Sequence, residues 1–126
     1  MPRPQMRMSG PVLDTNDVPT LIDFYNEFLG WAIEDSGPFW GRVRSPDGEK
    51  IEIQHEEHFV AAVWPGRAGE QGMQLHLDIW VDDLDAGVAW CIECGGAEAP
   101  SQPDGRDLTR LRVMLDPAGH PFCLWN

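Results

Sequence analysis

Two short segments carry residue types that bind metals or take part in redox chemistry. Cys91 and Cys94 form a CxxC pair, but redox pairs lie at helix N-termini, where the helix dipole lowers the thiol pKa. These cysteines fall in the last turn of an expected helix, so we interpret them as core or near-core thiols. Residues 55 to 58, HEEH, lack the HExxH spacing of zinc enzymes. They lie where an expected strand enters a loop, which favours a solvated acidic turn.

His76 and two arginines lie on expected strands. Alternating apolar residues predict a strand over residues 73 to 80, with His76 on the side opposite the apolar residues. Its imidazole could bind a ligand there, or could be held by a neighbouring side chain such as Asp78 or Arg112. Arg110 and Arg112 share a face of the strand expected over residues 110 to 115 and would point toward the free side of the sheet. They could receive a carboxylate or phosphonate, or pair with acidic residues.

The chain contains six Trp, too many for all of them to lie in the core of a small domain. Trp80 and Trp125 share strand parity with His76 and Cys123, so we expect both to line a ligand site or a dimer contact. Aromatic walls bind flat or apolar ligands through their area and by stacking. A dimer interface uses the same residue types for the same reason.

An internal repeat supplies the elements that position these residues. Asp17 and Gly30 bound a helix-period apolar stripe over residues 18 to 29, and Asp83 and Gly96 bound a second stripe. Acidic N-caps and glycine C-caps are typical helix start and stop signals. In the first unit we expect strands at about 6 to 14, 31 to 35, 39 to 44 and 49 to 55, and the same order begins again at 73. Residues 56 to 72 are Gly-rich and turn-prone, typical of a linker or a flap.

Length, charge and cysteine content narrow the classes of function. A chain of 126 residues with 42% hydrophobic content fits one domain. Its 9 Lys and Arg against 21 Asp and Glu give a net charge of −12, which would repel nucleic acid and anionic membranes. We find no apolar run of signal-peptide length and none near the roughly 20 residues of a membrane span. We therefore expect a cytoplasmic protein whose three Cys are reduced.

Three blocks resemble the glyoxalase/bleomycin-resistance/extradiol-dioxygenase family, also called the vicinal oxygen chelate (VOC) family. They are DFYNEFLGW at 23 to 31, HLDIWVDDLDAGVAW at 76 to 90 and DPAGHPFCLW at 116 to 125. The resemblance implies an α+β fold in which two tandem βαβββ modules form a curled mixed sheet that encloses a cup. Module one would span about 6 to 55, the connecting loop 56 to 72, and module two about 73 to 126. Many members pair modules between chains, so a homodimer is implied.

The resemblance also implies where a metal would bind. Metal-dependent relatives take ligands from the first strand and the last strand of each module. Matching the motifs and the repeat places these positions at Gly10, Glu52, His76 and Cys123. Glycine has no side chain to ligate a metal, and a Cys stands where the family carries Glu. A Glu, His and Cys set could still hold zinc, and other members use iron, nickel or manganese, but loss of the ancestral site is the simpler interpretation.

Fold alone does not fix function, so we carry two hypotheses. In the first, no cofactor or metal is needed, and the cup binds a small aromatic or anionic molecule; the expected ligand-binding residues are His76, Glu52, Cys123, Gln54, Trp80, Arg112 and Trp125. In the second, Glu52, His76 and Cys123 hold the ion of a metal-dependent lyase, isomerase or dioxygenase of the glyoxalase type. A domain that serves only as a dimerising unit is a third interpretation.

Overall fold

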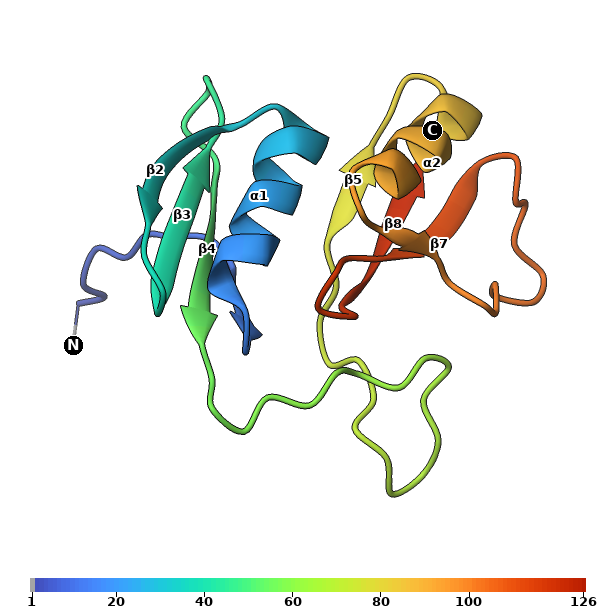
Figure 1. The fold of residues 1–126 in the computed structure, drawn as a ribbon, viewed down its shortest axis with the longest axis horizontal. Coiled ribbons are helices and arrows are strands. Elements are labelled where there is room, and N and C mark those ends of the chain that lie inside the picture. The colour runs from blue at the N-terminus through green and yellow to red at the C-terminus, as the bar shows by residue number, and fades with distance from the viewer. Residues whose placement is uncertain (1) are drawn as a thin grey trace.

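The computed structural model describes residues 2–126 and contains the two predicted βαβββ modules side by side (Figure 1). The elements of module one are β1 (Val12–Thr15), α1 (Val18–Leu29), β2 (Ala32–Ser36), β3 (Trp40–Arg44) and β4 (Lys50–His55). Those of module two are β5 (Asp78–Trp80), α2 (Leu84–Glu93), β6 (Ala97–Glu98), β7 (Leu111–Leu115) and β8 (Pro121–Trp125). The predicted fold class is confirmed.

Each module folds into its own four-stranded mixed sheet. The strand orders are β1-β4-β3-β2 and β5-β8-β7-β6, with β1 parallel to β4 and β5 parallel to β8. In both sheets the first strand of the module is an edge strand. The two sheets are not joined by strand pairing within residues 2–126.

Both helices begin at the predicted N-cap residues, and α1 also ends at the predicted glycine, whereas the C-cap of α2 is Cys94, before the predicted Gly96. The Asp17 carboxylate accepts a hydrogen bond from the Thr20 backbone N–H, and Gly30 ends α1 with a left-handed φ of 70°. Asp83 caps α2 in the same way through Ala86, but α2 ends at Glu93, just before Gly95 takes the positive φ of 108°. Neither helix described has the length and apolarity needed to cross a membrane.

Two predicted strands are shorter than the alternation suggested. The strand expected from about residue 6 begins at Val12, and the strand expected over residues 73 to 80 is limited to Asp78–Trp80. Leu75, although apolar and in phase, is almost fully exposed. Alternation of apolar and polar residues indicates which side chains could share a face, but a strand also needs a paired neighbour. Strand β8 pairs with β5 only from Asp78 onward.

Helix α1 joins the two modules into one hydrophobic core. It covers β2, β3 and β4 of its own sheet and also contacts β8 of the other module, where Phe28 and Phe122 have ring centroids 5.7 Å apart. The Trp90 indole N–H on α2 donates to the Phe28 carbonyl of α1 at 3.1 Å. Figure 1 shows α1 between the first sheet and β5. The modules therefore have a fixed contact, with α1 at its centre.

Gly41 of β3 is required by the packing of α1 on the first sheet. A Cβ at this position would overlap Cγ1 and Cδ1 of the fully buried Ile22. Because overpacking a filled core forces side chains and backbone to shift, Gly41→Ala is expected to lower the free energy of unfolding by about 1 to 3 kcal/mol. Urea unfolding measures this loss. Adding Ile22→Val should recover part of it, and Gly37→Ala, whose Cβ would make only ordinary contact, is the control expected to be neutral.

Candidate functional site

Each sheet has one face covered by its own module's helix and one face that no helix covers. On the second sheet the register opposes Asp78 to Cys123 and Trp80 to Trp125, and opposed side chains of paired strands share a face. Trp80 and Trp125 are 59% and 43% exposed. The predicted grouping of Trp80, Trp125 and Cys123 on one face therefore agrees with the register.

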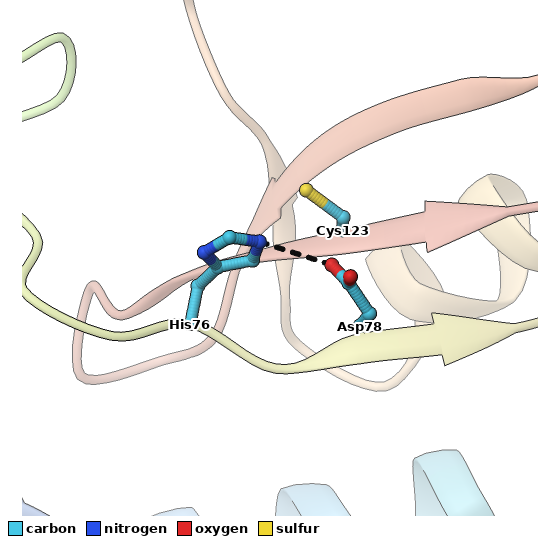
Figure 2. Close-up of side chains that lie close together, drawn as sticks. All are labelled: His76, Asp78 and Cys123. Carbon is cyan, nitrogen blue, oxygen red and sulfur yellow. Dashed lines mark ion pairs between the residues drawn. The ribbon is translucent and has the colours of Figure 1, made fainter.

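His76, Asp78 and Cys123 form a compact polar cluster at the start of this face (Figure 2). The His76 Nε2 lies 3.0 Å from a carboxylate oxygen of Asp78, and one ligand atom from each of the three residues lies within 4.8 Å of the other two. Burial raises the pKa of the Cys123 thiol, and the Asp78 carboxylate raises it further. Of the two neighbouring side chains that could hold His76, Asp78 is the one that it contacts.

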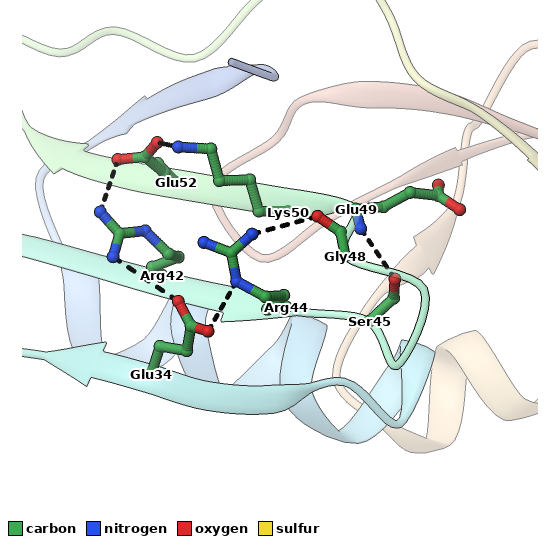
Figure 3. Close-up of polar contacts among 8 residues, drawn as sticks. All are labelled: Glu34, Arg42, Arg44, Ser45, Gly48, Glu49, Lys50 and Glu52. Carbon is green, nitrogen blue, oxygen red and sulfur yellow. Dashed lines mark hydrogen bonds and ion pairs between the residues drawn. The ribbon is translucent and has the colours of Figure 1, made fainter.

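Glu52 belongs to a different cluster, on the first sheet (Figure 3). Its carboxylate is paired with the Lys50 ammonium and lies 3.4 Å from the Arg42 guanidinium. Arg42 in turn faces Glu34, which Arg44 binds at 2.6 Å. The hydrogen bond from Lys50 is the main cause that lowers the pKa of Glu52, and Arg42 adds to it. The charge of Glu52 is therefore already neutralised by protein cations.

The four positions implied for a family metal do not come together as one site. Gly10 lies beside Lys50: a Cβ on Gly10 would be 3.1 Å from the Lys50 carbonyl oxygen. The lysine side chain thus runs past the position of the missing ligand and ends on Glu52. Glu52 is also absent from the metal-compatible group, whose third member is Asp78. The predicted set of Glu52, His76 and Cys123 does not fit a shared ion in this arrangement.

The remaining predicted ligand-binding residues have protein partners. Gln54 donates to the Asp14 carboxylate at 2.6 Å across β1 and β4. Arg112 was expected to point toward the free side of its sheet, and that orientation is wrong. It is opposed to the buried Leu124, on the face that α2 covers, and it binds Glu98 at 3.1 Å.

A cavity of about 260 Å³ lies between the modules, beside β1 and the segment that leads into β5. Its wall is mostly apolar, and its histidines are His76 and His120. The lining residues are Pro11, Val12, Leu13, Tyr25, Leu75, His76, Leu77, His120, Pro121 and Phe122. The strand β1 is unpaired on this side, and β5 begins only at Asp78, so the cavity lies where residues 75 to 77 have no strand neighbour.

A buried hydrogen-bond array supports one wall of this cavity. The fully buried Asp116 carboxylate accepts from the Tyr25 hydroxyl at 2.7 Å, and His120 Nδ1 lies 2.8 Å from the same oxygen. Burial is the main cause that raises the pKa of Tyr25, and the charge of Asp116 adds to it. Sequence reasoning missed this array. The DPAGH turn places Asp116 and His120 together, but the third member comes from α1.

The cysteine pair and the connecting loop have structural contacts. Cys91 is completely buried, and burial raises its thiol pKa to about 12, which confirms the interpretation of a core thiol and argues against redox use. In the loop of residues 56 to 72, the Trp64 indole donates to the Ser101 carbonyl at 2.9 Å, and the Phe59 ring lies 5.6 Å from the His120 ring. The loop is thereby attached to module two.

The pairing of Lys50 with Glu52 predicts a pH-dependent stability. Lys50→Met is expected to lower the free energy of unfolding by about 1 to 2 kcal/mol at neutral pH, because the buried Glu52 loses its main partner. Because the pKa of Glu52 is lowered in the folded state, the ion pair stabilises the fold at pH values above the unfolded pKa, near 4.3. This stabilisation is lost as the pH falls through the pKa of the folded state. Chemical unfolding at several pH values should therefore show the variant and wild type converging in acid. A pH-independent difference would contradict the assignment.

Comparison with known proteins gives one family match and many structural matches. Residues 11–125 match the family model described as a glyoxalase-like domain. None of the curated proteins matches the chain. Each solved structure named below is less than 25% identical to this chain, so it supports the fold alone.

Three solved structures illustrate the similarity. A glyoxalase/bleomycin resistance protein from Albidiferax ferrireducens T118 is 22% identical, with 94% of this chain and 96% of that chain covered and a TM-score of 0.62. The bleomycin-binding protein from Streptomyces verticillus, complexed with copper(II)-bleomycin, is 21% identical over 96% and 98%, with a TM-score of 0.61. A glyoxalase/bleomycin resistance protein/dioxygenase family enzyme from Burkholderia phytofirmans PsJN is 17% identical over 90% and 92%, with a TM-score of 0.63.

Proposed function

Since the chain belongs to the glyoxalase-like domain family of the VOC superfamily, whose fold is compatible with many activities, we propose that it binds a small aromatic molecule in the cavity between its two modules. The observation that carries the proposal is the cavity itself, about 260 Å³ with apolar side chains from β1, β8 and the segment before β5 around it. A dry cavity of about 150 Å³ already binds benzene. A wall of apolar groups with a few polar ones is typical of small-molecule sites.

The charges favour a neutral aromatic ligand over an anion, the other class expected from the sequence. No Lys or Arg lines the cavity among the residues described. The cations of the first sheet are paired with Glu34 and Glu52, and Arg112 is paired with Glu98. An anion entering a chain of net charge −12 would therefore meet no free cation in the described cavity wall.

Titration with matched small molecules tests this proposal. We expect 4-nitroanisole and toluene to bind saturably at one site per chain in calorimetry and to raise the melting temperature, because a ligand that binds only the folded state stabilises it. Benzoate, similar in size but anionic, should bind more weakly. If none of these probes binds at millimolar concentration, the proposal fails, and a purely dimerising unit becomes the better interpretation.

A second candidate, a metal-dependent lyase, isomerase or dioxygenase, is favoured by the cluster of His76, Asp78 and Cys123. An imidazole nitrogen, a thiolate and a carboxylate form a ligand set that suits zinc, with one position open. The ion would supply a Lewis acid when bound. Calorimetry with Zn²⁺ should then show stoichiometric binding that His76→Ala abolishes and the exposed-site control His58→Ala retains. Equal uptake by the two variants would exclude this candidate.

A homodimer is the proposed assembly. Trp80 and Trp125 leave large aromatic area exposed on a sheet face without a helix, and contiguous apolar patches of this kind mark interaction sites. A second copy of the chain covering this face would remove that area from water. Sedimentation equilibrium should give a dimer for wild type and a monomer for Trp80→Ser/Trp125→Ser, whereas Phe39→Ser, which removes an exposed aromatic of module one, should remain dimeric.

A further inference from the structure

We propose that His120 is the group that recognises the ligand's hydroxyl, and that the preferred ligand is therefore a phenol whose proton the imidazole accepts. This inference rests on the proposed function, since it places the aromatic ring in the same cavity. It adds a chemical class and a named acceptor atom, Nε2 of His120.

The Asp116 carboxylate fixes the orientation of His120. The Asp116 side chain is 0% exposed. It accepts hydrogen bonds from the Tyr25 hydroxyl at 2.7 Å and from the backbone N–H groups of Ala118 and His120, both at 3.0 Å. With three donors already on its two oxygens, the Asp116 carboxyl has little room for a proton of its own, and an ionised carboxylate can only accept. We therefore assign the hydrogen of the 2.8 Å contact to His120 Nδ1.

The other ring nitrogen is consequently free to act. With hydrogen on Nδ1, Nε2 of a neutral imidazole is an acceptor, and it has no hydrogen-bond partner among residues 2–126. The ring lines the cavity and also contacts Phe59, with 5.6 Å between the ring centroids. Tyr25, which also lines the cavity, already donates its hydroxyl to Asp116, so it does not satisfy Nε2.

This arrangement matches the chemistry of a phenol. The ring would occupy the apolar space lined by Leu13, Leu77 and Phe122, and its O–H would donate to Nε2. For an acidic phenol the O–H bond breaks and an N–H bond forms at Nε2, which leaves a phenolate beside an imidazolium. The Asp116 carboxylate at Nδ1 stabilises that imidazolium. No other reactant is required.

A matched pair of probes tests the inference. In wild type 4-nitrophenol should bind about tenfold more tightly than 4-nitroanisole, the value of one hydrogen bond to an imidazole. Binding should also increase the absorbance of the nitrophenolate anion relative to the free probe at the same pH. In His120→Phe, which keeps an aromatic ring but has no Nε2, the two affinities should become equal. His58→Phe, at an exposed histidine of the connecting loop, should keep the difference.

Each outcome decides between the two levels of the proposal. If 4-nitroanisole binds wild type and 4-nitrophenol binds no better, the cavity binds ligands but His120 does not recognise the hydroxyl. If neither probe binds, both proposals are overturned. Should His120→Phe fail to fold, ¹⁵N NMR of wild type provides the test. The Nε2 resonance should move toward its protonated position with 4-nitrophenol and stay in place with 4-nitroanisole, and an equal response to both would contradict the assignment.

Discussion

Asp116→Ala is expected to lower the free energy of unfolding by about 3 to 5 kcal/mol, the largest loss that we predict for a single substitution in this chain. The carboxylate is fully buried and receives the Tyr25 hydroxyl, His120 Nδ1 and two backbone N–H groups. Removing it leaves all of these donors without their acceptor. Since Tyr25 lies on α1 and Asp116 follows β7, the substitution also removes a polar link between the modules.

Substitution of Tyr25, alone and together with Asp116, should show how much of that loss comes from the Tyr25 hydrogen bond. Tyr25→Phe removes one donor and keeps the carboxylate and the turn, so its cost should be only about 1 to 2 kcal/mol. The double variant should cost less than the sum of the two single variants, because with Tyr25→Phe the loss of Asp116 no longer leaves a hydroxyl unpaired. Urea unfolding at neutral pH measures all three. A loss below about 1 kcal/mol for Asp116→Ala would show that water replaces the carboxylate and that the array does not stabilise the fold.

The same contact predicts the alkaline limit of stability. Burial and the Asp116 charge raise the pKa of Tyr25 in the folded state. Below about pH 10, the pKa of tyrosine in the unfolded state, the phenol is neutral in both states and its full contribution to stability is present. As the pH rises above this value, the unfolded state ionises before the folded state does, and that contribution is lost. Wild type should therefore lose stability above about pH 10 more steeply than Tyr25→Phe. Parallel pH profiles would contradict this origin.

Local signals were enough to predict the helices and the repeat. Asp17 and Gly30 bound α1 as expected because caps act through hydrogen bonds and φ values that depend only on nearby residues. The two-residue period of β4 likewise placed Ile51 and Ile53 in the core and Glu52 on the other face. The parity of Trp80 with Trp125 was inferred correctly for the same reason.

Arg112 shows where the local signal was insufficient. Strand β7 carries apolar residues on both faces, since Val113 and Met114 are both buried. Alternation then separates two sets of residues without indicating which set faces the helix. The sequence suggested that the core-facing set was Leu111, Val113 and Leu115. The pairing of Met114 with Phe122 instead places the core on the face that Met114 shares with Arg112. The contacts that determine which face of β7 is buried come from β8 and α2, and the alternation within β7 alone does not predict them.

The array at His120 needed tertiary information of another kind. The turn brings Asp116 and His120 together within a few residues, but a buried carboxylate is stable only with enough donors. One of those donors, Tyr25, comes from the opposite module. In the sequence Tyr25 fits the apolar stripe of α1 and appears as an ordinary core residue. Its hydroxyl partner, Asp116, depends on how the two modules pack against each other.

Leu77→Trp is expected to weaken binding of 4-nitroanisole at least about 100-fold, because the indole occupies the space in which the ligand ring would lie. Leu77 lines the cavity and packs against the edge of the core. The added volume enters a cavity of about 260 Å³, so the free energy of unfolding should change by less than about 1.5 kcal/mol. Calorimetry with 4-nitroanisole measures the affinity, and urea unfolding verifies the fold.

The control for this variant is Leu108→Trp, which adds the same indole at a position outside the cavity. It should bind 4-nitroanisole as wild type does. If Leu77→Trp is folded and also keeps its affinity, the ligand does not lie between the modules. The aromatic face formed by Trp80 and Trp125 would then be the better location, since its exposed indoles offer a surface on which a ring can stack. Loss of affinity in Trp80→Ser/Trp125→Ser with Leu77→Trp unaffected would establish that location directly.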